Sequence, residues 1–190
     1  VQLAQAEAIM RKRINKKHMD NGVTIINPEN TYIEANVQIG KDTIIEPGVM
    51  LRGNTEIGDE CIIGMNSSIT NSKIGNFTEV KISTIIDSAV GENTTVGPYA
   101  YLRPNSNVGN HVKIGDFVEV KNANIGDYSK ASHLSYIGDA DVGKDVNIGC
   151  GVVFVNYDGK NKFRSVVEDG AFIGSNSNLV APVHVKHKGY

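Results

Sequence analysis

The sequence has no tryptophan, only two cysteines and five prolines, and 6% aromatic residues. Cys61 and Cys150 lie too far apart to make the disulfide framework of a small secreted domain, so we expect a reducing, cytoplasmic environment. No apolar run approaches the roughly 18 residues of a membrane-spanning helix, and no signal peptide is visible. The 19 basic and 21 acidic residues give a formal net charge of -2. We therefore expect neither a membrane nor a nucleic-acid partner.

Glycine is abundant, with 20 residues in a chain of 190, of which 40% are hydrophobic. These values fit one soluble domain that contains many tight turns. The chain begins at Val1 and stops at Tyr190 inside a repeat pattern. We therefore expect it to be a piece of a longer protein, cut at both ends.

A six-residue repeat runs through the chain and is marked by recurrent Ile-Gly and Val-Gly pairs. A small or β-branched residue lies two positions before most of the repeated aliphatic residues, also across the five-residue steps. The predicted inward aliphatic series is Ile33, Ile39, Ile45, Leu51, Ile57, Ile63, Ile69, Ile74, Val80, Ile86, Val90, Val96, Leu102, Val108, Ile114, Val120, Ile125, Ala131, Ile137, Val142, Ile148, Phe154, Val167, Ile173, Leu179 and Val185.

A period of six fits neither a helix nor an open amphipathic strand. It predicts a short strand and a tight turn, with three such units closing a triangular coil of about 18 residues that stacks on the next coil. A glycine-rich sandwich is the alternative, but it would need regular hairpin turns and period-2 strands. We therefore predict an all-β parallel β-helix. The spacing alone does not give its handedness.

Two segments depart from the repeat. Residues 1–19 place Leu3, Ala6, Met10 and Ile14 at helical spacing, with basic residues in the second half and a stop at Asn21-Gly22. The basic run fits a solvated helix end better than a nucleic-acid patch. Residues 156–162 interrupt the phase, so we expect an outward loop of the kind that commonly carries function.

Counting coils predicts which distant side chains stack. His133, Cys150 and Ser175 each follow a face-A aliphatic residue by two positions and should form a column. Arg103 and Lys121 should stack one coil apart, where two cations repel unless an anion bridges them. Glu119 offers a plain ion pair to Lys121 as the alternative.

His133 is the candidate general base, because Tyr136 lies close by at the A–B corner and Asn147 and Cys150 lie one coil further on. A polar surface histidine is the alternative interpretation. Cys150 is predicted to be a small neutral filler, since no helix N-terminus is present to lower a thiol pKa. The other histidines show no spacing that predicts a metal site with His133.

The repeat and several motifs resemble one bacterial family, the bifunctional N-acetylglucosamine-1-phosphate uridylyltransferases / glucosamine-1-phosphate N-acetyltransferases. The matching motifs are Tyr101-Leu102-Arg103-Pro104, Phe117-Val118-Glu119-Val120-Lys121, residues 130–139, Asn147-Ile148-Gly149-Cys150-Gly151, residues 156–159 and Asn161-Lys162. The resemblance implies that residues 1–22 are a linker helix and that residues 23–190 are a left-handed β-helix acetyltransferase domain, truncated at its C-terminus. The resemblance further implies that the family's nucleotidyltransferase domain, with its Mg²⁺ site, is not part of this chain. The resemblance also implies a homotrimer with sites between subunits.

The activity that the resemblance implies is transfer of acetyl from acetyl-CoA to the 2-amino group of glucosamine 1-phosphate, which feeds UDP-N-acetylglucosamine and cell-envelope synthesis. His133 matches the general base of the family. Its substrate contacts match Arg103, Lys121, Tyr136, Asn147 and Lys162, and its acetyl-CoA contacts match Asn156, Tyr157, Ser175 and the backbone at Cys150.

The sequence departs from the family pattern in two ways. Cys150 stands where the family has a small alanine, and its thiol narrows the space expected for acetyl-CoA. The family also continues past Tyr190 with coils that touch acetyl-CoA, so we expect weakened acetyl-CoA binding. Three alternatives stay open: a hexapeptide acyltransferase with another phosphorylated acceptor, a γ-type carbonic anhydrase, and a trimeric scaffold with a crippled site.

Overall fold

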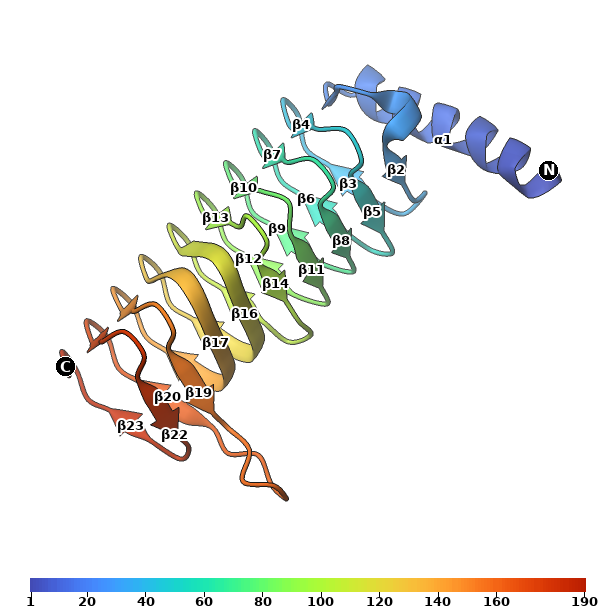
Figure 1. Ribbon diagram of the computed structural model, residues 1–190. Helices are drawn as coiled ribbons and strands as arrows, with labels where there is room; N and C mark the ends of the chain where they lie inside the picture. The colour runs from blue at the N-terminus through green and yellow to red at the C-terminus, as the bar shows by residue number, and fades with distance from the viewer.

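The computed structural model describes residues 1–190, which form one α-helix followed by a parallel β-helix (Figure 1). Helix α1 spans Gln2–Asp20, and a 3₁₀ turn follows at Pro28–Asn30. Face A holds β1 (Thr24–Ile25), β4 (Ile44–Ile45), β7 (Ile62–Ile63), β10 (Glu79–Val80), β13 (Thr95–Val96), β18 (Asn147–Ile148) and β21 (Phe172–Ile173). Face B holds β2 (Tyr32–Ile33), β5 (Met50–Arg52), β8 (Ser68–Thr70), β11 (Thr84–Ile86), β14 (Tyr101–Leu102), β19 (Val153–Val155) and β22 (Asn178–Val180). Face C holds β3 (Gln38–Ile39), β6 (Glu56–Ile57), β9 (Lys73–Ile74), β12 (Ala89–Val90), β15 (Asn107–Val108), β20 (Ser165–Val167) and β23 (His184–Val185).

Two long strands, β16 (Lys113–Ile125) and β17 (Lys130–Val142), each run across all three faces of one coil. All pairings between named strands are parallel, and each strand pairs with the same face of the neighbouring coils. The predicted all-β parallel β-helix of hexapeptide repeats is confirmed. In Figure 1 the front strands run from upper left to lower right while the coils advance toward lower left, which is the sense of a left-handed helix.

The core is a single column of aliphatic side chains inside the coils. Equivalent residues stack in register, as Leu102 does on Val120 and Val120 on Ile137. All three are fully buried. The small residues two positions earlier also point inward, and their hydroxyl groups bond the backbone of the next coil, as Thr94 Oγ1 does with the Gly109 carbonyl at 2.9 Å. Stacked aliphatic burial therefore holds the coils together, and the inward hydroxyl groups, where present, add hydrogen bonds between neighbouring coils.

One predicted inward residue is wrong. Ile85, not Ile86, is fully buried, and Ile85 pairs with Ile69 below it and Leu102 above it. Ser83 is correspondingly the inward small residue. The chain takes two five-residue steps from Val80 to Val90, where the sequence suggested a six and a four.

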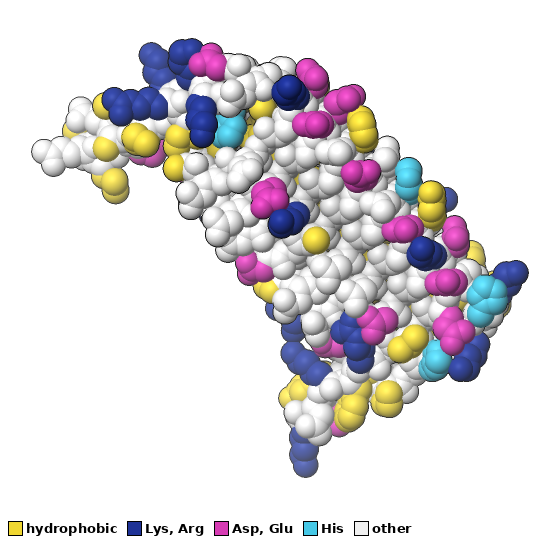
Figure 2. Space-filling view, turned by 180° about the vertical axis from the view of Figure 1, so that it is seen from behind, with side chains coloured by type: hydrophobic (Ala, Val, Ile, Leu, Met, Phe, Trp, Pro, Cys, Tyr) yellow, Lys and Arg dark blue, Asp and Glu magenta, His cyan; other side chains and the backbone are white.

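Helix α1 covers the first coil. Asn15 anchors it by donating from Nδ2 to the carbonyls of Pro28 and Thr31, at 2.9 and 3.0 Å. The helix ends at Asp20, as the Asn21-Gly22 signal predicts. Of the predicted apolar stripe, Leu3 and Met10 are exposed, so this stripe packs little against the β-helix. Basic side chains gather over the helix in the upper left of Figure 2. The structure contains no candidate membrane-spanning helix.

The segment 156–162 leaves the β-helix as the predicted outward loop, visible as the orange hairpin at the bottom of Figure 1. It folds back on itself through a bridge between Tyr157 and Lys162. Asp158 Oδ1 accepts the backbone N–H groups of Lys160 and Asn161 at 2.8 and 2.7 Å. These two bonds hold the pKa of the exposed Asp158 carboxyl below its usual range.

Candidate functional site

The predicted column of His133, Cys150 and Ser175 is present at the corner between faces A and B. Ala131 pairs with Ile148, and Ile148 pairs with Ile173, so residues two positions later also stack. The column continues below His133 with Asp116, whose Cα is the register partner of His133.

Asp116 holds one edge of the imidazole of His133. Its Oδ1 lies 2.9 Å from His133 Nδ1. An N–H at Nδ1 that donates to this carboxylate leaves Nε2 as a bare acceptor that faces solvent. The sequence analysis missed Asp116, although it follows Ile114 by the same two positions that separate His133 from Ala131.

The predicted cation pair lies at the other end of face B. Arg103 donates its backbone N–H to the Val120 carbonyl at 2.8 Å, which places it one coil below Lys121. Glu119 pairs with Arg103 at 2.8 Å rather than with Lys121. The side-chain hydrogen bond from Arg103 to Glu119 is the main reason that the pKa of Arg103 is raised.

We refer to Lys162 of the projecting loop, together with Arg103 and Lys121, as the cation cluster. The side chain of Lys162 is the largest cause of a lowered pKa at Lys121, followed by desolvation and by the charges of Lys162 and Arg103. Like charges gathered on one surface repel one another unless an anion bridges them, so these three residues could hold an anion. An oxyanion with several acceptors, such as a phosphate, matches this donor set.

Tyr136 lies on face B between these two ends, not at the A–B corner where the sequence analysis placed it. It pairs with Glu119 below and Val153 above. Its hydroxyl runs over Gly138, so closely that a Cβ at this position would collide with the tyrosine oxygen. Tyr136 therefore lies in the middle of a surface that has His133 at one end and the cation cluster at the other. Five residues at about 3.3 Å each separate His133 from Gly138, so their Cα atoms are at most about 17 Å apart. The side chains of His133 and of the cation cluster shorten the distance between their functional groups.

Gly138→Ala is expected to disturb this surface without unfolding the coil. The added methyl group would meet the hydroxyl end of Tyr136, so the ring must turn away at small cost in stability. We expect an affinity loss of about tenfold for an anionic ligand of the cation cluster, measured by calorimetry with inorganic phosphate and glucosamine 1-phosphate. Gly174→Ala serves as the control, because Gly174 lies outside the cation cluster, its φ is not positive, and a Cβ there would meet only Ser177 Oγ at 3.9 Å. Equal affinities in the wild type and Gly138→Ala would contradict the assignment.

A polar network that the sequence analysis missed joins the cation cluster to the loop. Asp139 is 8% exposed, and its Oδ1 accepts the Nδ2 group of Asn122 at 2.5 Å. Its Oδ2 accepts the Nδ2 group of Asn156, which also donates to Tyr136 Oη at 3.3 Å. The three residues each follow a face-B aliphatic residue by two positions, so coil counting could have found this column too.

The remaining predicted residues fall outside this surface. Asn147 lies at the start of face A beside Lys130, and the structure does not bring it to the cation cluster within one chain. Tyr157 lies on the exposed loop, where its hydroxyl donates to the Gly159 carbonyl at 2.7 Å. His111 stacks on Tyr128 with ring centroids 4.8 Å apart at the C–A corner, so it does not approach His133.

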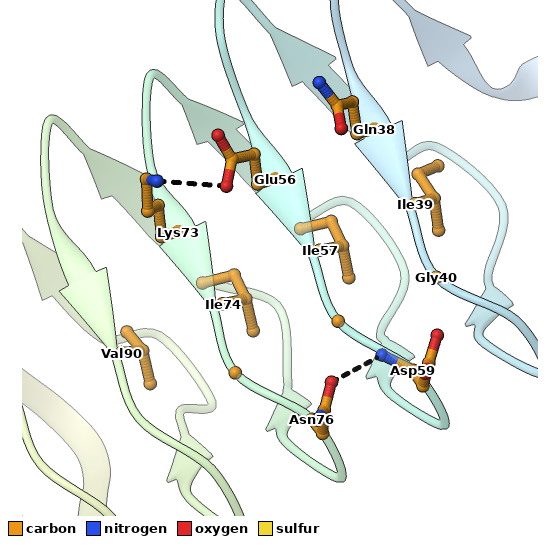
Figure 3. Close-up of a pocket in the computed structure, with 12 residues that line it drawn as sticks. Gln38, Ile39, Gly40, Glu56, Ile57, Asp59, Lys73, Ile74, Asn76 and Val90 are labelled. Atoms are coloured by element: carbon orange, nitrogen blue, oxygen red, sulfur yellow. Dashed lines mark hydrogen bonds and ion pairs between the residues drawn. The ribbon is translucent and has the colours of Figure 1, made fainter.

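A groove on face C, shown in Figure 3, is separate from these residues. It runs over Gly40, Gly58 and Gly75, whose missing side chains let neighbouring coils approach closely. Its polar contacts are structural: Lys73 pairs with Glu56 at 3.0 Å, and the Asp59 backbone N–H donates to Asn76 Oδ1 at 2.9 Å (Figure 3). The groove offers no residue set for catalysis.

Comparison with known proteins identifies the family of the repeat. A family model described as bacterial transferase hexapeptide (six repeats) matches residues 36–71 and 87–122. The chain is 76% identical over 190 residues to the bifunctional protein GlmU of Clostridioides difficile (strain 630), and 72% identical over 189 residues to that of Alkaliphilus oremlandii (strain OhILAs). The chain is a hexapeptide-repeat segment of the GlmU family. The two matches cover the whole of this chain but only 41% and 42% of the length of these GlmU relatives.

A solved structure shares the fold of this GlmU segment. The UDP-N-acetylglucosamine acyltransferase from Campylobacter jejuni aligns with a TM-score of 0.55 at 16% identity, covering 82% of this chain and 66% of that one. At this identity the likeness shows the β-helix alone.

Proposed function

We propose that this GlmU segment transfers acetyl from acetyl-CoA to the 2-amino group of glucosamine 1-phosphate. One observation carries the proposal: a histidine with a free ring nitrogen and a three-cation anion site flank the same face, with Tyr136 between them. An amino sugar phosphate has the two matching groups, an amine to deprotonate and a phosphate to hold. Both cysteines are free, which fits a reducing compartment, so we propose a cytoplasmic enzyme.

The phosphate end of the acceptor would bind the cation cluster. Arg103 supplies a planar fork of donors, and Lys121 and Lys162 supply point charges. Glu119 holds the guanidinium in place through its 2.8 Å contact. The sugar would then lie over Tyr136 with its amine toward His133, and Asn147 of a second copy is the remaining proposed acceptor contact.

His133 Nε2 would take the proton from the attacking amine. The amine nitrogen forms a bond to the thioester carbonyl carbon, the C–S bond breaks, and the CoA thiolate leaves and is protonated. Asp116 stabilises the imidazolium that forms, because its carboxylate lies 2.9 Å from Nδ1. No enzyme nucleophile is needed, so the Cys150 thiol takes no covalent part.

Acetyl-CoA would bind along the corner above His133. The proposed contacts are the Cys150 backbone, Ser175, Asn156 and Tyr157, of which the first two continue the histidine column. The Cys150 backbone N–H is the proposed donor to the thioester oxygen, where negative charge develops in the transition state.

We propose a homotrimer with sites between subunits, on the basis of a corner ridge formed by Ile82, Tyr99, Phe117 and Leu134. Tyr99, Phe117 and Leu134 are 56%, 58% and 59% exposed. All four have positive φ, at a cost of about 1 kcal/mol each that asparagine would reduce. Asn66 and Asn176 occupy the same corner in other coils. Large apolar side chains at a strained, exposed corner next to His133 are explained by burial against a second copy of the chain.

Phe117→Asn is expected to dissociate the trimer while leaving the coil intact. Asparagine suits the local backbone, and the substitution removes a ring that stacks on Tyr99 at 5.4 Å. The oligomeric mass by light scattering should fall at micromolar concentration, while circular dichroism stays the same. Tyr128→Asn, at the exposed C–A corner, is the control. A monomeric wild type would contradict the trimer.

The decisive test is CoA release with glucosamine 1-phosphate as acceptor. We expect turnover with this acceptor and little with unphosphorylated glucosamine, because the cation cluster would then hold nothing. Turnover with another amino sugar phosphate but not with glucosamine 1-phosphate would support the alternative acceptor. Phosphate binding without any CoA release would support the scaffold.

A further inference from the structure

A buried carboxylate, Asp139, follows Gly138, the register partner of Lys121, and takes no part in the chemistry proposed above. It is 8% exposed and occupies the same position of its coil as Asn122 in the coil below and Asn156 in the coil above. Both amides point their Nδ2 groups at it, one at each oxygen. A buried carboxylate with two amide donors is well satisfied, and these charge-assisted bonds are stronger than neutral ones.

The bond from Asn156 reaches the loop. Asn156 is the first residue of the loop, and its carbonyl accepts the Phe163 N–H at 2.9 Å, which closes the base of the loop. Lys162 lies just inside that base. Fixing Asn156 against Asp139 therefore fixes the point from which Lys162 reaches toward Lys121.

The other end of the loop is held from the same two coils. Arg164 donates from Nη1 to the Asn122 carbonyl and from Nη2 to the Ala140 carbonyl, both at 2.9 Å. It also bonds both oxygens of Asp141 at 2.6 Å, and this contact lowers the pKa of Asp141 and raises that of Arg164. Asn122 thus contacts the residues that hold both ends of the loop: its side chain bonds Asp139, and its carbonyl accepts from Arg164.

Without such anchors, the two lysines would separate. Lys121 and Lys162 are like charges, and Lys162 is the largest cause of the lowered pKa of Lys121, so an exposed loop can relieve their repulsion by moving. We propose that Asp139 is a positioning residue that clamps the loop through Asn156 and so keeps Lys162 beside Lys121 before any anion binds. A preorganised cluster binds its anion more tightly, because the loop need not be ordered on binding. The inference deepens the proposed function, which supplies the phosphorylated acceptor.

The clamp is tested without a substrate by trypsin cleavage after Lys160 and Lys162. Asp139→Asn fits the column, since asparagine occupies the same position in the coils on both sides. We expect cleavage to accelerate by about tenfold or more, because two charge-assisted bonds are weakened. Asn156→Ala should give the same rate, and the double variant should add little, since all three variants lose the same contact. Asp127→Asn is the matched control, because asparagine fills the equivalent corner at Asn76 and Asn110.

The pKa of Lys121, followed by NMR of labelled lysine, separates positioning from simple charge. The Asp139 charge itself raises the pKa of Lys121, whereas Lys162 lowers it more strongly. If Asp139 clamps the loop, Asp139→Asn releases Lys162 and the pKa of Lys121 rises toward its ordinary value. A further fall in that pKa, or a cleavage rate equal to that of Asp127→Asn, would overturn the proposal.

These readouts stay informative if the proposed acceptor is wrong. Faster cleavage and a raised Lys121 pKa in Asp139→Asn support the clamp even when the wild type releases no CoA with glucosamine 1-phosphate. Calorimetry with inorganic phosphate then tests whether the clamp affects anion binding, and we expect Asp139→Asn to lose about tenfold in phosphate affinity. Unchanged phosphate affinity together with unchanged cleavage would reject the clamp while leaving the acetyltransferase proposal in place.

Discussion

His133→Ala should lower kcat for acetyl transfer by about 10²–10⁴-fold, the range that a positioned general base supplies. The affinity for glucosamine 1-phosphate should change little, because the cation cluster at the other end of face B is untouched. Steady-state kinetics of CoA release give kcat, and calorimetry gives the affinity. Asp116→Asn should produce a smaller loss of kcat, since it leaves the imidazole in place but removes the charge 2.9 Å from Nδ1.

His111→Ala is the matched control for this experiment. His111, like His133, lies at a corner of the β-helix, but it stacks on Tyr128 away from face B. Its replacement should leave kcat within a factor of about two. Full activity in His133→Ala would exclude His133 as the base and would leave the scaffold as the better interpretation.

Ile137→Ala should destabilise the β-helix by about 2–5 kcal/mol, and Ile137→Val by about 0.5–1.5 kcal/mol. Ile137 is fully buried and stacks on Val120, so truncation opens a cavity in the middle of the aliphatic column. Neighbouring coils cannot collapse into that cavity because their spacing is fixed by strand hydrogen bonds. Urea unfolding at a fixed protein concentration measures the effect.

The control for the stability experiment is Ile62→Ala. Ile62 is the neighbour of buried Ile63 in the two-residue strand β7, but it points outward and is 40% exposed. We expect a change of about 0.5 kcal/mol or less. Equal losses at Ile137 and Ile62 would contradict the stacked core.

The architecture could be predicted from the sequence because one rule repeats in every coil. An aliphatic residue with a small partner two positions earlier identifies the inward pair, and the columns follow by counting. The count failed between Val80 and Val90, because Ile85 and Ile86 are chemically identical and only the pairing with Ile69 distinguishes them. Spacing alone could not supply handedness, since it is unchanged in a mirror image.

The candidate site could be predicted only in part. Counting gave the stacking of Arg103 on Lys121 and of Cys150 on His133, since register depends on coil length. It did not give the choice of Glu119 for Arg103 or the approach of Lys162, because these depend on side-chain rotamers and on the path of the loop. The resemblance to the family named residues whose roles as base, acceptor contacts and acetyl-CoA contacts are still proposals.

Each coil closes its strand pairing only with the coil before and the coil after it. During translation the chain can therefore fold one coil at a time, each new coil pairing with the coil before it. The contact between Asp116 and His133 joins residues 17 positions apart and can form early. Arg164 reaches back 42 positions to Asn122, so the loop is fastened only after two further coils have been synthesised. The histidine end of the surface would thus mature during translation before the cationic end.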